Sequence, residues 1–317
     1  MLKFPDNIIN SILQSFVDGR GLRNANLQVQ SRAKYLFLKF VKPLKDRLST
    51  FVDGLYSYVK DMIEITLPTD QELLQMQDFS SDRLFLYETI GSLLASQRVS
   101  SETRVSILQQ IFTPINARLD EILSQKLYLS DTPEKPRFTR YIHSLINAIG
   151  TLSKGFDDSS SKKIYLKDGV DFFKHFLVYV TRVHSEMPMN KSIQTIVIFY
   201  YHRMIELMNE EVLEIIPETL SHLYQTCHEI YQLKDILILL GQLMQKFKEK
   251  VFNIVNEMFG PIINKLFPMI KNGNYDFSLI GSSEEMREIA DLHKAYFTFI
   301  QTILLSGLKQ VLISESK

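Results

Sequence analysis

Large apolar residues in the stretch SRAKYLFLKFVKPLKDRL, residues 31–48, recur at the spacing of one face of an α-helix. At about 100° of rotation per residue, one arc of roughly 140° contains the positions Leu36, Phe40, Ala33, Leu44, Phe37, Leu48 and Val41. The other side of the helix carries the lysines Lys39, Lys42, Lys45 and Lys34. The pattern therefore predicts an amphipathic helix whose apolar face is buried.

Pro43 interrupts this pattern. A proline has no amide hydrogen and disfavours α geometry at the residue before it, which is Lys42 here. We therefore expect a kink or a break at this point, with a second helix running on from Leu44. The basic face belongs mainly to the first of the two helices.

The same helical period recurs along the rest of the chain, for example in SSETRVSILQQIFTPINARLDEILSQ and NKSIQTIVIFYYHRMIELMN. Serine, threonine or aspartate stands where several of these patterns begin, as expected of helix N-caps. The runs VIFY and ILILL resemble short strands in isolation, but each lies inside a longer helical pattern and no alternating hairpin surrounds either. The chain is therefore predicted to be all-α.

Four segments share an apolar pair, a break and a second apolar stripe: FVDGLYSYVKDMI, IFTPINARLDEIL, IIPETLSHLY and MFGPIINKLF. The break contains Pro114, Pro217 or Pro261 in three of them and Asp53 in the first. The longest gap between copies is close to twice the shortest, as expected if one copy has decayed beyond recognition. Units of roughly 40 to 47 residues made of two antiparallel helices are typical of HEAT repeats. Residues 1–317 are therefore predicted to form a single HEAT-repeat superhelical solenoid segment with a right-handed curve.

A second helix of a HEAT repeat tends to begin Asp-x-x-Val-Arg-x-x-Ala, with an apolar residue four positions later. This pattern is matched by Asn26, Val29, Ala33 and Phe37, while Gln30 replaces the arginine. Residues 27–42 are therefore predicted to be a second helix, the kind that lines the concave surface of a solenoid.

The helical arc and this register together define which side chains of residues 27–42 should be covered. We expect Leu36, Phe37 and Phe40 to be buried. We expect Lys39 and Lys42 to be exposed on the concave side, so that the basic face is open to a partner.

The charge balance limits how the chain could attract a polyanion. It has 36 basic and 36 acidic side chains among 317 residues, 45% of which are hydrophobic. Such a chain forms a sizeable core and has no global field, so any nucleic-acid site has to be local. No uncharged apolar run reaches the roughly 20 residues that span a bilayer, and we expect no membrane insertion.

Signals of catalysis and of metal binding are missing from the sequence. The single cysteine, Cys227, fits a reducing compartment, and no two of the seven histidines are four residues apart. The segment Gly19-Arg20-Gly21 lacks the surroundings of a phosphate-binding loop and is predicted to be a tight turn between two helices. We expect no enzyme activity, no metal and no cofactor.

Several stretches, in the same order, resemble the exportin-T family, the tRNA-export receptors of the importin-β (karyopherin) superfamily. They are DGRGLRNANLQVQSRAKYLFLKFVK, FVDGLYSYVKDMIE, SSDRLFLYETIGSLL, IFTPI, FYYHRMIELMNEEVLEIIP and AYFTFIQTILLSGL. The resemblance covers nearly the whole chain and matches the middle of the family's longer proteins, so the chain is expected to be a fragment of a longer karyopherin.

The resemblance implies a HEAT-repeat receptor that binds tRNA together with GTP-bound Ran and shuttles between nucleus and cytoplasm. It implies tRNA, Ran-GTP and nuclear pore proteins as partners. The alternative that the residues leave open is a helical-repeat scaffold that binds a protein partner on its concave face. Zero net charge favours this scaffold, while the family-like motifs favour the tRNA receptor.

Candidate nucleic-acid-binding residues are the basic side chains between positions 20 and 45: Arg20, Arg23, Arg32, Lys34, Lys39, Lys42 and Lys45. Clusters of this kind neutralise phosphates. The competing interpretation is a solvated helix face without a ligand. A second group, Lys246, Lys248 and Lys250, occupies alternating positions that spread around a helix, and we interpret it as solubilising charge.

Overall fold

The computed structural model describes residues 5–69, 71, 73, 81–129, 135–156, 166–271 and 284–313. Within these residues the regular structure is helical, and no strand occurs. The all-α prediction is therefore confirmed. The chain divides into two compact units, Met1–Val183 and His184–Lys317. The single continuous segment expected from the sequence stays a prediction.

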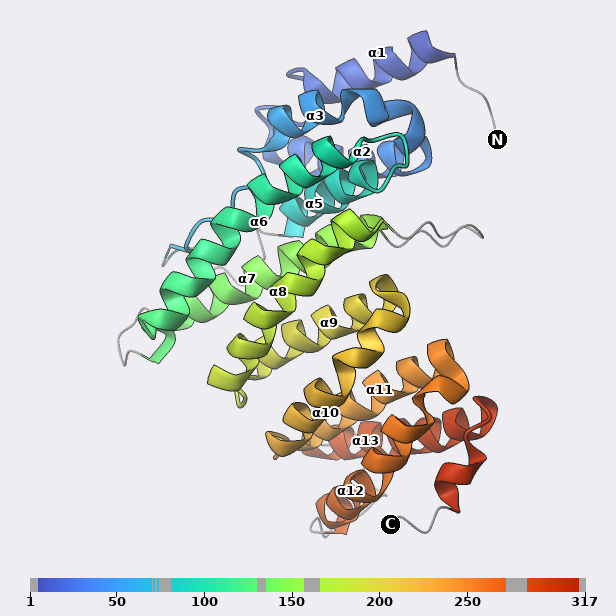
Figure 1. Cartoon of the computed structure of the whole chain (residues 1–317). Helices are drawn as coiled ribbons and strands as arrows, with labels where there is room; N and C mark the ends of the chain where they lie inside the picture. Colours follow the sequence, from blue (N-terminus) through green and yellow to red (C-terminus); the bar gives the residue numbers. More distant parts are fainter. Residues whose placement is uncertain are drawn as a thin grey trace. The chain divides into compact units, whose positions relative to one another are not determined.

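The first unit is built from pairs of neighbouring helices (Figure 1). Its helices are α1 (Asp6–Val17), α2 (Leu27–Leu48), α3 (Val52–Val59), α5 (Ser81–Leu94), α6 (Ser101–Ser124), α7 (Lys135–Ser153) and α8 (Lys167–Glu186), whose last residues belong to the second unit. The pair α1 and α2 is antiparallel, because the end of α1 packs on the middle of α2 while Asp6 at its start pairs with Arg47. Likewise α3 packs on α5, and α6 packs on α7. The second members also pack on one another, α2 on α5 and α5 on α7.

The second unit repeats this arrangement. Its helices are α9 (Lys191–Leu207), α10 (Ile216–Gln225), α11 (Ile230–Phe247), α12 (Phe252–Lys271) and α13 (Glu284–Leu305). Here α9 packs on α11 and α11 packs on α13, while α10 and α12 both contact α11. In both units one row of helices packs side by side with first helices set against it, which is the HEAT-type helical repeat predicted from the sequence.

The four recurring segments fall on equivalent helices. Asp53 lies in α3, Pro114 in α6, Pro217 at the start of α10 and Pro261 in α12, and each of these is the first helix of its pair. The longest gap, between Pro114 and Pro217, contains α7, α8 and α9. That a copy decayed beyond recognition lies in this gap stays a prediction.

Proline does not break these helices. At Pro43 this corrects the predicted break, while the other expectation, a kink, stays a prediction. Pro43 lies inside α2, which continues to Leu48, and Pro114 and Pro261 lie inside α6 and α12. A helical proline forfeits one backbone hydrogen bond. In α2 the turns on both sides are held by fully buried side chains, Val41 before the proline and Leu48 after it. Tertiary packing thus carries the helix through Pro43.

The buried face of α2 is rotated by roughly 60° from the predicted arc. Phe37 is buried as predicted, but Leu36 is exposed and Phe40 is half-buried. Leu38 and most of the Lys34 side chain are buried instead. The reason is that α2 has two partners, since α5 packs along a side of α2 that lies outside the arc while α1 covers Phe37.

Arg104 of α6 ties three elements of the first unit together. The residue is 3% exposed and donates hydrogen bonds to backbone carbonyls at and beyond the end of α5, those of Leu94, Ser96 and Val99. Its guanidinium also pairs with Asp168, in the first turn of α8, at 2.5 Å. The buried charge is therefore paired, and carbonyls that the helix end leaves without an internal partner are satisfied.

Other helix ends are closed in the same way by a cation from another element. Arg98 donates to the Asp46 carbonyl near the end of α2. In the second unit, Lys265 of α12 donates to the Tyr224 carbonyl at the end of α10, at 2.8 Å. Lys246 of α11 donates to two carbonyls in the last turn of α9. The interpretation of Lys246 as solubilising charge is therefore wrong, because its ammonium caps a neighbouring helix.

Phe37 offers a direct test of the corrected register of α2. Its ring is fully buried and packs against Phe16 of α1 with a centroid distance of 5.3 Å. We expect Phe37→Ala to lower the free energy of unfolding by about 3 to 5 kcal/mol, because it leaves a cavity in the core. Leu36→Ala is the matched control on the exposed side of the same turn and should cost less than about 1 kcal/mol. Chemical denaturation measures both, and equal effects would contradict the register.

His184, near the end of α8, is a buried titratable group in the second unit. It is 1% exposed, and its Nδ1 atom has no hydrogen-bond partner. The ring packs edge-on against His222 of α10 with a centroid distance of 5.0 Å, and His222 Nε2 shares a hydrogen bond with Ser185 Oγ at 3.0 Å. Burial, with a smaller contribution from His222, lowers the pKa of His184 to about 4.

This histidine makes the stability of the second unit depend on pH. Its pKa is about 4 in the folded state against an ordinary 6.5, so between these values the unfolded chain takes up a proton that the folded chain does not. We expect the free energy of unfolding to fall by up to about 3 kcal/mol as the pH drops through this window. His184→Phe keeps the ring contact and removes the titration, so it should lose this dependence.

The control is the difference between the two proteins at each pH. Burial raises the pKa of Asp235 to about 6. Protonation of this carboxyl group therefore raises the free energy of unfolding as the pH falls below that value. Both proteins carry Asp235, so the difference isolates His184. A difference that stays constant between pH 7 and pH 4 would contradict the role given to His184.

Candidate nucleic-acid interface

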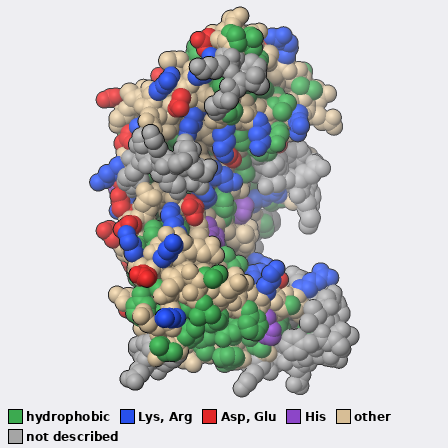
Figure 2. All heavy atoms as spheres, turned by 90° about the vertical axis from the view of Figure 1, so that its right-hand side faces the viewer, with side chains coloured by type: hydrophobic (Ala, Val, Ile, Leu, Met, Phe, Trp, Pro, Cys, Tyr) green, Lys and Arg blue, Asp and Glu red, His purple; other side chains and the backbone are tan. Residues whose placement is uncertain are grey.

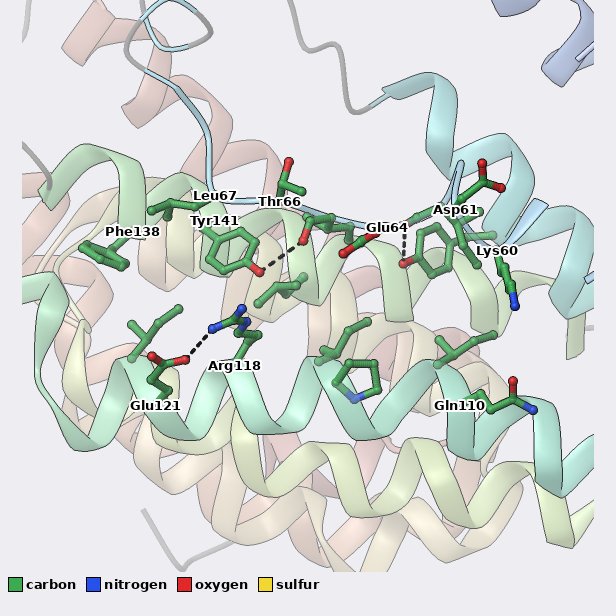
Figure 3. Close-up of a pocket in the computed structure, with 18 of the residues that line it drawn as sticks. Lys60, Asp61, Glu64, Thr66, Leu67, Gln110, Arg118, Glu121, Phe138 and Tyr141 are labelled. Carbon is green, nitrogen blue, oxygen red and sulfur yellow. Dashed lines mark hydrogen bonds and ion pairs between the residues drawn. The ribbon is translucent and has the colours of Figure 1, made fainter. Parts of the chain in front are cut away.

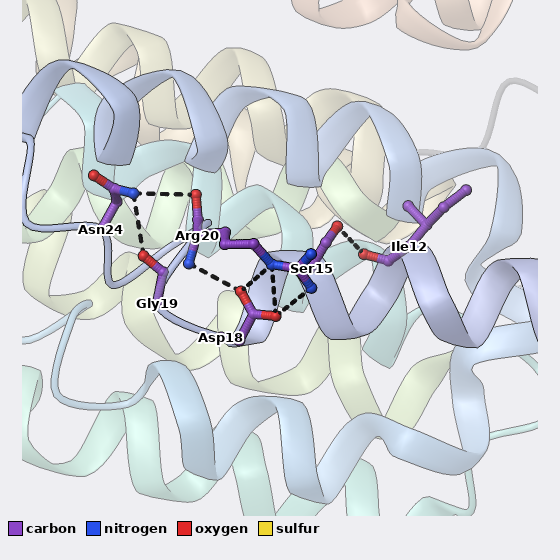
Figure 4. Close-up of polar contacts among 6 residues, drawn as sticks. All are labelled: Ile12, Ser15, Asp18, Gly19, Arg20 and Asn24. Atoms are coloured by element: carbon purple, nitrogen blue, oxygen red, sulfur yellow. Dashed lines mark hydrogen bonds and ion pairs between the residues drawn. The ribbon is translucent and has the colours of Figure 1, made fainter.

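Arg20 lies in the loop between α1 and α2, where it pairs with Asp18 (Figure 4). The guanidinium donates to both carboxylate oxygens, with Nη2 at 2.6 Å from Oδ2. These hydrogen bonds lower the pKa of Asp18. A Cβ atom on Gly21 would lie 2.4 Å from the Phe16 carbonyl oxygen, so only glycine fits this turn. The predicted tight turn at Gly19-Arg20-Gly21 is confirmed.

Arg23 forms hydrogen bonds and an ion pair with residues at the end of α3. Its Nη2 atom donates to the Tyr58 carbonyl at 2.7 Å and to Asp61 at 2.8 Å, and its guanidinium lies 4.7 Å from the centre of the Tyr58 ring. The hydrogen bond from Arg23 lowers the pKa of Asp61. The side chain is partly exposed, but its donors already serve this helix end.

Besides Lys39, the candidate set contains three more lysines, and they differ in how much of the side chain is exposed. Lys42 is exposed as predicted and pairs with Glu88 of α5 at 3.2 Å. Lys34 is buried, its ammonium bonds to Gln30 at 3.3 Å, and burial lowers its pKa. Lys45 is half-buried. Lys34 therefore has little surface to offer an anion.

Arg32 and Lys39 differ from these residues because both are exposed and flank one aromatic ring. The Arg32 guanidinium lies 5.0 Å and the Lys39 ammonium 5.5 Å from the centre of the Tyr35 ring. That ring packs edge-on against Phe85 of α5 at 5.4 Å, which fixes it on the surface of α2. Within the described part of the chain neither cation has an acidic partner. We call Arg32, Tyr35 and Lys39 the Tyr35 cluster.

The Tyr35 cluster has the chemistry of a phosphate-binding surface. Two cations held by one ring lose less side-chain freedom on binding than two free ones, and an aromatic face attracts both. By helical rotation Arg32 and Lys39 lie on the side of α2 away from the buried Phe37. Figure 2 shows basic side chains spread over this face of the molecule, several of them beside acidic ones.

Sequence reasoning found the cations of this cluster and missed the tyrosine. The signal was present, since Tyr35 lies three residues after Arg32 and four before Lys39, the separations at which helical side chains meet. The pairing of Arg23 with Asp61 and of Lys42 with Glu88 has no such local signal, because each joins residues far apart in the chain.

In the described residues, no three histidine, cysteine, aspartate or glutamate side chains come together in a way that could hold a metal ion. None of the helices in that part of the chain has both the length and the apolar character needed to cross a membrane.

The fold and this surface define a HEAT-type helical-repeat protein with a small cationic cluster on a second helix. The Exportin-T family model matches residues 2–317, and the chain belongs to the Exportin-T family. It is 30% identical over 319 residues to the Exportin-T of Homo sapiens, covering 97% of this chain and 31% of the relative. It is 28% identical to those of Dictyostelium discoideum and Arabidopsis thaliana, over 96% of this chain in both. The chain spans about 30% of the length of these relatives.

A pair of substitutions tests that Lys34 is buried while Lys39 is exposed. Burial lowers the pKa of the Lys34 ammonium, so the charge is held at a cost. We expect Lys34→Met to keep the free energy of unfolding or raise it by up to about 1 kcal/mol, because methionine fills the same space without a charge. Thermal denaturation of this variant and of Lys39→Met, the exposed control, measures the effect. A loss of several kcal/mol in Lys34→Met alone would show that its charge is needed for the fold.

Proposed function

We propose that this chain is part of a nuclear export receptor that binds tRNA together with GTP-bound Ran and carries it from the nucleus to the cytoplasm. The observation that carries the proposal is membership of the Exportin-T family along residues 2–317. The proposal includes passage through nuclear pores by contact with pore proteins, and it includes no catalytic step.

The Tyr35 cluster is the part of this chain that we assign to the tRNA backbone. It lies on α2, a second helix, and second helices line the inner surface of HEAT-type solenoids. Phosphate contacts read the shape of an RNA and not its sequence, which suits a carrier of many tRNAs. Arg20, Arg23, Lys34, Lys42 and Lys45 belong to the same proposal in a minor role, since most of them already serve the fold.

A helical scaffold for a protein partner is the second candidate function. It is favoured by the zero net charge and by the internal ion pairs of Arg20, Arg23 and Lys42. In that case Arg32 and Lys39 are solvated surface, and tRNA binding does not depend on them.

A salt titration of tRNA binding separates the two functions. With GTP-bound Ran present, the double variant Arg32→Ala/Lys39→Ala should bind more weakly and to a similar extent for different tRNAs. The slope of log affinity against log salt should flatten by about 1.5 units, from roughly 0.7 to 0.9 per lost phosphate contact. The fold should keep its stability, because exposed charges contribute little to it.

The matched control removes two exposed lysines of the second unit, Lys294→Ala/Lys309→Ala, and changes the net charge equally. If both double variants lose the same affinity, the effect is one of net charge alone. If Arg32→Ala/Lys39→Ala leaves slope and affinity unchanged, the assignment of tRNA to this cluster is wrong.

A further inference from the structure

A pocket of about 810 Å³ lies beside the linker between α3 and α5 in the first unit (Figure 3). The hydroxyl group of Tyr141 points toward this linker and donates to the Ile65 carbonyl at 3.1 Å. The guanidinium of Arg118 pairs with Glu121 at 2.7 Å. These polar groups are bonded within the protein itself, so they need no ligand.

A second pocket, in the second unit, is lined by three neighbouring second helices. Its volume is about 560 Å³, within the range of about 300 to 1,000 Å³ that is usual for ligand sites. One wall comes from α11, another comes from α13, and His202 of α9 adds to the lining. We call it the α11–α13 pocket. The residues that matter below are Lys234, Ile238, Gly241 and Gln242 of α11 and Asp291 and Lys294 of α13.

Gly241 leaves the backbone of α11 bare where the helix lines this pocket. It lies in the interior of the helix, where glycine is less favourable than alanine because the chain loses more freedom on folding. A Cβ atom at this position would meet no atom within 4 Å in the described part of the chain. Packing there does not require a glycine, whereas a ligand that lies against the helix backbone does.

His202 has a hydrogen-bond acceptor that the described residues leave unused. The amide nitrogen of Gln242 donates to the Glu206 carboxylate at 2.7 Å and to the His202 carbonyl at 3.3 Å. The amide oxygen of Gln242 therefore faces the His202 ring and accepts a hydrogen bond from Nδ1. Because Nδ1 carries the proton, Nε2 has a free lone pair, and no donor to it occurs in the described part of the chain.

The charges of the pocket leave one cation without a counter-ion. Lys234 and Asp291 form a long ion pair of 3.8 Å. Lys294 is exposed, and among the described residues its ammonium has no acidic partner. A ligand with a single carboxylate would balance Lys294. A nucleic-acid strand has a phosphate at each nucleotide and would bring further anions next to Asp291, so the pocket favours a peptide over RNA.

We propose that the α11–α13 pocket binds a peptide segment of a partner protein that carries one acidic and one large apolar side chain. The carboxylate bonds to Lys294, and the apolar side chain lies against Gly241 and Ile238, which is 47% exposed. A main-chain amide of the peptide donates to Nε2 of His202. This site is separate from the Tyr35 cluster and does not depend on tRNA binding.

Gly241→Ala separates binding from folding. The added methyl group occupies space that the peptide needs, and alanine favours the helix, so the variant should bind more weakly while its melting temperature does not fall. Gly54→Ala is the matched control. Gly54 also lies in a helix, α3, with no atom within 4 Å of a Cβ position, but it belongs to the first unit. This control should keep the affinity of the unaltered chain.

The probes are fluorescein-labelled eight-residue peptides with one glutamate and one leucine or phenylalanine, one to four positions apart, and with glycine and serine elsewhere. Fluorescence anisotropy with the 317-residue chain should show saturable binding of at least one peptide. Gly241→Ala should weaken this binding by about fivefold and Lys294→Ala by about tenfold, because a hydrogen bond to a charged group is lost in the second case. Lys309→Ala removes an exposed lysine outside the pocket and should have no effect.

Two further variants should produce changes that a loss of folding cannot produce. Asp291→Asn removes the carboxylate that competes with the peptide for the cations, so it should tighten binding by about threefold. Lys294→Glu should reject the glutamate peptide and bind the same peptide with lysine in place of glutamate.

The proposal is overturned if no peptide of the set saturates below about 1 mM, or if Gly241→Ala binds as tightly as Gly54→Ala. It is overturned as well if Asp291→Asn binds no more tightly than the unaltered chain, or if the lysine peptide does not recover binding to Lys294→Glu. If a short single-stranded RNA binds in place of the peptides and loses affinity in Gly241→Ala, the pocket is an RNA site and the proposal is wrong.

Discussion

Helix ends are the constraint on which this fold depends, because a stack of helix pairs buries many carbonyl groups that no helix can satisfy internally. Arg104 meets this need at the end of α5 and simultaneously pairs with Asp168 of α8, so that one buried guanidinium joins three elements. Lys246 and Lys265 do the same for α9 and α10 in the second unit. A cation suits the negative end of a helix dipole, and the carbonyl bonds offset part of the cost of burying it.

This use of cations explains why several of the candidate basic side chains already have partners within the described residues. Arg23 illustrates the point, since the side chain that looks available in the sequence is bonded to the end of α3. Lys42 is likewise paired with Glu88. What remains exposed and without an acidic partner in the described candidate stretch is the Tyr35 cluster, where an aromatic ring and not a carboxylate holds Arg32 and Lys39. A cation beside a ring keeps its charge available to a phosphate, whereas a cation in an ion pair must first give up its partner.

In the linker after α3, side chains of neighbouring helices also donate hydrogen bonds to backbone carbonyl groups. Side chains of α5 and α7 donate hydrogen bonds to three of its carbonyls, those of Glu64, Ile65 and Pro68. The donors are the guanidinium groups of Arg83 and Arg137 and the hydroxyl group of Tyr141, which can pair carbonyl groups.

The sequence by itself determined the helical class, the repeat and the family, because periodicity, recurring positions such as Pro114 and Pro261, and family motifs are local or linear properties. It also located the turn at Gly21, where a backbone approach of 2.4 Å leaves no room for a side chain. Only the tertiary structure decided which face of α2 is buried. Helix α5 packs on a side of α2 that lies outside the predicted apolar arc, and this side includes Leu38 and Lys34. The tertiary structure also decided which cations form ion pairs. Arg23 pairs with Asp61 and Arg104 pairs with Asp168, and these residues are too far apart in the sequence for a helical pattern to predict the contact. Charge pairing acts through space, and its partners are set by how the helices stack.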